Sequence, residues 1–195
     1  MNPTSFLARQ TRRNYSGHLG LVVALGLAVT GLFSGGCVSR PDRQNIELFV
    51  QRAPLPTLVP SGQVLAAAEQ RAAAHQGDFV LHGVGASMEP VYLSGTVVVV
   101  HPSAFHMLRR GMPVVYVNRR GYHVAHMLME KVRGGWLAIG LNNADPDDTL
   151  VTPDNLVGIV RHAFVAEGTI FRPEIATRIA LNAAIEGAAP LAVLR

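Results

Sequence analysis

The stretch FVLHGVGASMEPVYLSGTVVVV, residues 79–100, decides the fold that the sequence predicts. It ends on four successive valines, Val97 to Val100, and two more apolar runs of the same kind follow at residues 114–117 and 158–160. Glycine, proline and asparagine bound these runs, which is the pattern of short β-strands joined by turns. Residues 79–165 are therefore predicted to form a mostly β domain.

The same stretch holds a serine in a turn of small residues, Gly85-Ala86-Ser87-Met88-Glu89-Pro90. A serine hydroxyl is a weak nucleophile at neutral pH and needs a neighbouring base to take its proton. Ser87 is thus a candidate nucleophile if the chain supplies that base. The alternative is a turn serine that only satisfies local backbone donors, which is common in glycine-rich segments.

Candidate bases are few, because 16 of the 17 Lys and Arg residues are arginines, which stay protonated. The only lysine is Lys131, and His126 is the best placed histidine. On a regular strand Val124, His126 and Leu128 share one face, while Lys131 lies on the other. Strand alternation therefore favours His126 as the base. The alternative is a histidine that is buried, hydrogen-bonded and chemically idle.

The first 36 residues hold Arg9, Arg12 and Arg13 and no acid, so they carry +3 of the formal net charge of +4. The remainder is nearly neutral, and the sequence therefore gives no reason to expect a nucleic-acid partner. An apolar run at residues 19–33 follows the arginines and leads into Ser34-Gly35-Gly36-Cys37. A basic region, an apolar region and a small-residue site in this order predict a signal peptide or membrane anchor over residues 1–37.

Cys37 is the only cysteine, and its position resembles the lipobox of bacterial lipoproteins, in which the cysteine is lipidated and becomes the new N-terminus. The alternative is an uncleaved single-span anchor. Either interpretation predicts an exported chain held at the membrane on its outer side, periplasmic or extracellular, because the arginines stay inside.

Three further segments flank the predicted β domain. Four prolines in residues 38–61 predict a linker, and the alanine-rich residues 62–78 predict a helix. Residues 166–195 predict a C-terminal helical tail, in which Ile175 and Ile179 recur at near-helical spacing. We expect this helix to cover the sheet, and the alternative is a helix that contacts the membrane.

Five short motifs follow one another along the predicted β domain. They are Ser87-Met88-Glu89-Pro90, Ser94-Gly95-Thr96-Val97-Val98-Val99, Arg110-Gly111-Met112-Pro113-Val114-Val115, Gly140-Leu141-Asn142-Asn143 and Gly158-Ile159-Val160. This order resembles the signal peptidase I and LexA-like serine peptidase superfamily. The resemblance implies a LexA/signal-peptidase-like β-rich catalytic domain with flanking helices.

The resemblance also implies roles for individual residues. Ser87 matches the nucleophile, and His126 matches the base of the branch found in archaea and the endoplasmic reticulum, where a histidine replaces the lysine of other members. Asp147 or Asp148 matches the acid that follows the Asn-Asn pair and would orient the imidazole. The alternative for these acids is a solvated turn.

Met88 of the first motif is expected to pack and hold the turn, and the resemblance implies that Met88 and Pro90 also border the substrate. The partners implied are a peptide or protein substrate and, through the N-terminal lipid or anchor, the membrane. No cofactor is implied, and no metal, because His123 and His126 would face opposite sides of a strand. His82, His101, His106 and His123 are expected to have no role in the site.

The leading hypothesis is therefore a membrane-tethered serine endopeptidase with a Ser-His dyad, assisted by an aspartate. Some positions depart from the family's pattern. Thr96, Met112 and Leu141 stand where relatives usually carry aspartate, and Met127 stands where an arginine commonly follows the base. These departures support an alternative, a catalytically inactive surface lipoprotein that uses the same fold as a binding or assembly module.

Overall fold

The computed structural model describes residues 43–188, with residues 43–45, 186 and 188 described by their backbone alone. The predicted signal peptide or anchor at residues 1–37, with Cys37, lies outside the described residues. So do the first residues of the predicted linker. Among the described residues, no helix combines the length and the apolar character that crossing a bilayer requires.

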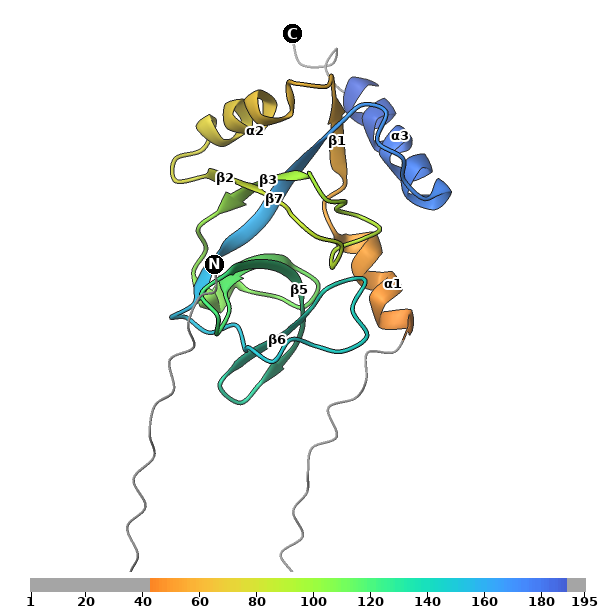
Figure 1. The fold of residues 1–195 in the computed structure, drawn as a ribbon. Coiled ribbons are helices and arrows are strands. Elements are labelled where there is room, and N and C mark those ends of the chain that lie inside the picture. The colour runs from red at the N-terminus through yellow and green to blue at the C-terminus, as the bar shows by residue number, and fades with distance from the viewer. Residues whose placement is uncertain (1–42, 189–195) are drawn as a thin grey trace, which may run out of the picture. The chain divides into compact units, whose positions relative to one another are not determined.

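The described part of the chain folds into seven strands and three α-helices (Figure 1). In chain order the elements are α1 (Arg43–Arg52), β1 (Pro56–Val59), α2 (Val64–Ala73), β2 (Phe79–His82), β3 (Val97–His101), the 3-10 helix η1 (Phe105–Met107), β4 (Pro113–Val117), β5 (His123–Val132), β6 (Gly135–Ile139), β7 (Leu156–Ala166) and α3 (Pro173–Ala188). The mostly β class that the sequence predicts is confirmed.

The strands form one sheet in the order β2-β3-β7-β4-β5-β6, and all neighbours on this path are antiparallel. β1 pairs in parallel with β7 and lies off the path. At 11 residues β7 is the longest strand, and it pairs with β1, β3 and β4. This one strand therefore joins the β2-β3 hairpin to the β4-β5-β6 meander.

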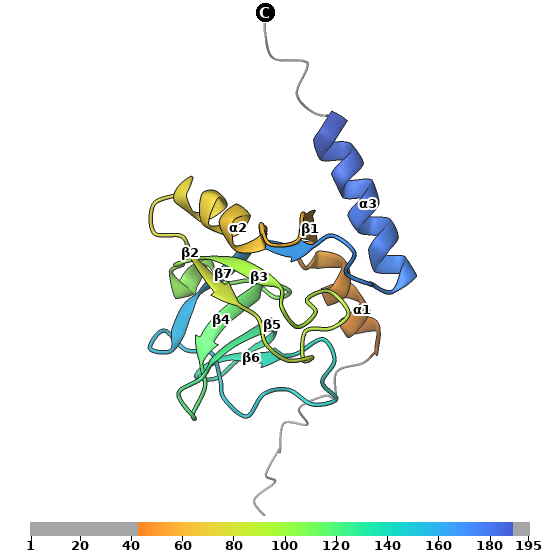
Figure 2. The same cartoon turned by 45° about the horizontal axis from the view of Figure 1, so that its top comes forward.

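The four valines of β3 are buried on both faces of the sheet, which explains why the strand shows no apolar-polar alternation. Val97 and Val99 pack against the alanines of α2, which lies along β2 and β3 (Figure 2). Val98 and Val100 point to the opposite face and join the main apolar core. β3 therefore lies between two layers, α2 on one face of the sheet and the main apolar core on the other.

The described part of residues 38–61 is not a linker, and that prediction is wrong. Phe49 of α1 is 2% exposed and lies in the main core, and β1 pairs with β7 from Pro56 to Val59. Pro56 is tolerated because it is the first residue of a strand with a single neighbour. The prolines of this part lie at the ends of helices and strands of the domain, so their number alone does not indicate a linker.

The two other predicted helical segments are helical in part. Residues 62–78 contain α2, and the chain after Ala74 turns toward β2. In α3, Ile175 and Ile179 are buried in the main core, whereas Leu181 and Ile185 are about 60% exposed. The first half of α3 therefore covers the core, as expected, and the second half does not.

We predict that Phe49→Ala lowers the free energy of unfolding by about 3–5 kcal/mol, because it leaves a cavity in the main core. The neighbouring Leu48 is 47% exposed, and Leu48→Ala is the matched control, expected to cost about 0.5 kcal/mol or less. Urea unfolding of the full chain measures both. Equal effects would contradict the placement of α1 in the domain.

Candidate active site

Ser87 lies in the loop that connects β2 to β3, and the next residue anchors that loop. Met88 is 6% exposed and packs into the main core, and its carbonyl accepts hydrogen bonds from the N–H groups of Val91 and Tyr92. Gly85 has φ +100°, a left-handed conformation that favours glycine. The loop therefore turns sharply before Ser87 and is fixed immediately after it.

The Gly140-Leu141-Asn142-Asn143 segment holds the serine turn from the other side. Asn142 donates from its backbone N–H to the Ser87 carbonyl at 2.9 Å and from its side-chain amide to the Ala86 carbonyl at 3.2 Å. A Cβ at Gly140 would lie 2.6 Å from the Ser87 carbonyl oxygen, so only glycine allows this approach. Two motifs distant in sequence thus form one rigid contact.

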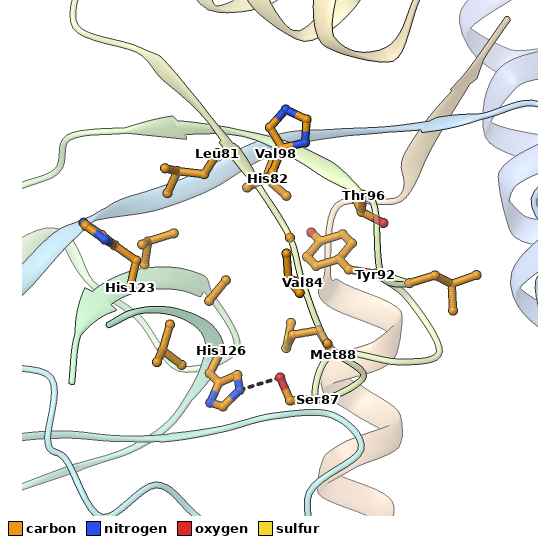
Figure 3. Close-up of a pocket in the computed structure, with 16 residues that line it drawn as sticks. Leu81, His82, Val84, Ser87, Met88, Tyr92, Thr96, Val98, His123 and His126 are labelled. Atoms are coloured by element: carbon orange, nitrogen blue, oxygen red, sulfur yellow. Dashed lines mark hydrogen bonds between the residues drawn. The ribbon is translucent and has the colours of Figure 1, made fainter. Parts of the chain in front are cut away.

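His126 is on β5 directly opposite Val114 of β4, and it is 6% exposed. Its Nε2 lies 2.9 Å from Ser87 Oγ (Figure 3). Val124 and Leu128 pack in the apolar cluster on the His126 side of the strand, whereas Met127 lies in the main core. The face predicted for His126 is therefore the face that it occupies.

Asp147 completes the arrangement. Its Oδ2 lies 2.6 Å from His126 Nδ1, and its backbone N–H donates to the Ala138 carbonyl at 2.8 Å. Asp148 is exposed and accepts a hydrogen bond from the Thr149 hydroxyl at 2.9 Å. Of the two candidate acids, the structure brings only Asp147 to the imidazole.

These contacts determine the tautomer of the imidazole. A carboxylate can only accept, so the short contact places the proton on Nδ1 of His126, which donates to Asp147. Nε2 then keeps its lone pair and accepts from the Ser87 hydroxyl. This is the protonation pattern that general-base activation of a serine requires.

The sequence predicts that Lys131 cannot be the base because it lies on the opposite face of the strand from His126. That reason is wrong, because β5 is not regular. The pairing of β5 with β6 shifts register between Leu128 and Glu130, so that Lys131 pairs with Trp136. Lys131 is excluded by distance instead. It is exposed and five positions beyond His126, and at about 3.3 Å per strand residue this separates the two by roughly 16 Å.

A pocket of about 340 Å³ opens beside Ser87 and His126 (Figure 3). Its lining is mostly apolar and includes Met88, whereas Pro90 is half-buried and does not line it. His82 and His123, for which the sequence suggested no role in the site, do line it. A mostly apolar hollow beside Ser87 suits a side chain of a bound ligand.

Two buried hydroxyls in the lining have no hydrogen-bond partner among the described residues, those of Tyr92 and Thr96. Both side chains are at most 5% exposed, and burial raises the pKa of Tyr92 well above its ordinary value. Thr96 is one of the positions where the resemblance predicts an aspartate. An unpartnered threonine hydroxyl is tolerated there more easily than an unpaired carboxylate would be.

Two other departures from the family's pattern lie together. Met127 is fully buried and Leu141 is 5% exposed, and both belong to the main core. A single charge at either position would be desolvated without a partner. The arginine and the aspartate expected at these positions are thus both replaced by apolar side chains in the same core.

Tyr116 is the residue that sequence reasoning missed. It is 1% exposed, and its hydroxyl donates to Asp147 Oδ2 at 2.6 Å. Burial, reinforced by the hydrogen bond and charge of Asp147, raises the pKa of Tyr116 far above its ordinary value. The hydroxyl therefore stays protonated as a donor. In the sequence Tyr116 is one apolar residue of a valine-rich strand, and only the strand register connects it with the site.

Among the described residues, no three His, Cys, Asp or Glu side chains gather closely enough to hold a metal ion. The chain matches no protein-family model and no curated protein at a significant level. Function is therefore inferred from the chemistry of the site itself.

We predict that Gly140→Ala lowers the free energy of unfolding by about 1–3 kcal/mol, because the new methyl group would overlap the Ser87 carbonyl. Gly187→Ala is the matched control: it lies in α3, where an added Cβ would meet nothing within 4 Å, and a helical Gly→Ala change there stabilises by up to about 1 kcal/mol. Urea unfolding gives both values, and effects of the same sign would contradict the contact.

Proposed function

We propose that the protein is a serine endopeptidase of the signal peptidase I and LexA-like type, in the branch that uses a histidine base. The observation that carries this proposal is the continuous chain of hydrogen bonds from Ser87 through His126 to Asp147, with contacts of 2.9 and 2.6 Å. The five ordered motifs and the mostly β fold support it further. A chemically idle histidine would need neither a serine at Nε2 nor a carboxylate at Nδ1.

In the proposed reaction Ser87 Oγ attacks the peptide carbonyl while His126 Nε2 takes the hydroxyl proton. The imidazolium that forms faces the carboxylate of Asp147, which stabilises it. The Ser87 N–H has no acceptor among the described residues, so it is free to donate to the oxyanion of the tetrahedral intermediate.

The second half of the reaction reverses the proton movement. His126 gives the proton to the leaving amine, and an acyl-enzyme forms on Ser87. Water then attacks the ester carbonyl, His126 again acts as the base, and the carboxylic acid product leaves with Ser87 restored. A peptide held as an extended strand would place one side chain in the mostly apolar pocket beside Ser87.

The second candidate function is a catalytically inactive binding module. It is favoured by Thr96, Met112, Met127 and Leu141, which differ from the residues usual in the resembled superfamily. In the structure Met127 and Leu141 are core residues and contact neither Ser87 nor His126 through a hydrogen bond. Their replacement therefore leaves the hydrogen-bonded chain intact. A measurement of Ser87 reactivity separates the two candidates.

We predict that a fluorophosphonate probe labels Ser87 in the full chain and that Ser87→Ala abolishes the label. Loss of the base in His126→Ala is expected to slow labelling by about 10²–10⁴-fold, because general-base catalysis contributes that much. Asp147→Asn should also slow it strongly, because an amide can hold the wrong tautomer. Mass spectrometry of the labelled peptide, followed over time, gives the rates.

Asp148→Asn is the matched control for this series and should label at the wild-type rate, since Asp148 contacts Thr149 and not the imidazole. Absence of label on Ser87 in the wild-type protein would contradict the peptidase proposal and favour the binding module. A peptide library digested by the wild-type protein but not by Ser87→Ala would then define the substrate.

We further propose that the domain is tethered to the membrane through Cys37. Mass spectrometry of the mature protein is predicted to find Cys37 as a lipid-modified N-terminus, and Cys37→Ser is predicted to retain the preceding residues. A wild-type chain that keeps those residues and an unmodified Cys37 would contradict lipidation and indicate the uncleaved anchor.

A further inference from the structure

Asp147 Oδ2 accepts two short hydrogen bonds from two different residues. His126 Nδ1 and the Tyr116 hydroxyl each lie 2.6 Å from this one oxygen. Since both partners are donors, the tyrosine and the imidazole are coupled through a shared acceptor atom.

The pairing of β4 with β5 explains why these two donors converge. Val114 lies opposite His126, and Tyr116 lies opposite Val124. Residues two apart on a strand share a face, so Tyr116 and His126 are on the same side of the sheet. The Tyr116 ring packs in an apolar cluster with Leu108, Leu128, Trp136 and Val151. The hydroxyl is thus presented from a rigid position.

The side chain of Asp147 makes few other contacts that would fix its orientation. Asp147 lies outside the strands, and its side chain is 14% exposed. Among the described residues, His126 and Tyr116 are its only side-chain hydrogen-bond partners. Without the tyrosine hydroxyl the carboxylate could turn toward water, and Nδ1 of His126 would lose its acceptor.

We propose that Tyr116 is a positioning residue that fixes the Asp147 carboxylate, and through it the tautomer of His126. Tyr116 is then the fourth member of the hydrogen-bonded chain. Its effect on catalysis rests on the proposed function. Tyr116 does not contact the reacting atoms. It acts by keeping the carboxylate oriented while the imidazole gains and loses its proton.

Tyr92 offers an internal comparison. It is buried to a similar degree, yet its hydroxyl has no partner among the described residues. Both tyrosines fill apolar space with their rings, but only Tyr116 uses its hydroxyl. Both Tyr116→Phe and Tyr92→Phe remove a hydroxyl from a buried ring. Only in Tyr116→Phe does this also remove a hydrogen bond.

The test is nitrogen-15 NMR of the histidine side chains in the full chain in detergent, with the His126 signals assigned by their loss in His126→Ala. In the wild-type protein we expect neutral His126 as the Nδ1–H tautomer, with a far-downfield Nδ1 proton. Tyr116→Phe should abolish that proton signal and mix the two tautomers, whereas Tyr92→Phe should leave both unchanged.

The fluorophosphonate labelling rate of Ser87 should fall about 10- to 100-fold in Tyr116→Phe, as expected for a small misplacement of the catalytic groups. A His126 tautomer and Nδ1 proton signal that are the same in Tyr116→Phe and wild type would overturn the positioning role. If the NMR changes occur but wild-type Ser87 is never labelled, the positioning role stands and the proposed function fails.

A second measurement covers the case in which Tyr116→Phe does not fold. Replacing Tyr116 by 3-fluorotyrosine keeps the ring and the donor but makes the phenol more acidic. A stronger donor draws charge from the shared oxygen, so the Nδ1 proton signal of His126 should move upfield. An unmoved signal would overturn the coupling.

Discussion

The pairing of β4 with β5, in the register that sets Val114 opposite His126, is the constraint on which the site depends. It places the imidazole on the same face as Tyr116 and directs both toward the loop that carries Asp147. β4 in turn pairs with β7, the strand that joins the two parts of the sheet. A slip of one residue in this register would send His126 to the opposite face and into the main core.

The parts of the site that the sequence predicted are those with short-range signals. Four valines in a row predict a buried strand, and a serine in a small-residue turn predicts a candidate nucleophile. Strand alternation predicts the correct face for His126, which it shares with Val124 and Leu128, because the register shift comes only after Leu128. Alternation fails for Lys131, which lies beyond the bulge, although its exclusion holds because the lysine is too far away.

The parts that the sequence could not predict depend on contacts between distant segments. Asp147 and Asp148 are adjacent and chemically identical, and only the hydrogen bond from the Asp147 N–H to Ala138 decides which one faces the imidazole. The proline-rich segment resembles a linker in sequence because its contacts are not local. β1 pairs with β7, which is more than 100 residues away, and Phe49 packs against core residues that are dispersed along the chain. Tyr116 has no local signal at all, since a tyrosine in a valine-rich strand is an ordinary core residue.

The positions that differ from the motifs of the resembled superfamily have a common physical form: they carry apolar or neutral side chains and bury no unpaired charge. Met127 and Leu141 share one core, and Thr96 offers a neutral hydroxyl. None of these side chains interrupts the polar chain from Ser87 to Tyr116. A buried network of this kind is costly when partly satisfied and specific when every member has its partner.

The proposed function requires that Ser87 is an activated nucleophile, with His126 as its base and its own N–H as an oxyanion donor. A crystal structure of the protein after reaction with a fluorophosphonate tests this most directly. We expect a covalent bond from phosphorus to Ser87 Oγ, a phosphoryl oxygen that accepts from the Ser87 N–H, and His126 Nε2 still facing the adduct. An unmodified Ser87, or an adduct whose phosphoryl oxygen points to solvent, would contradict it.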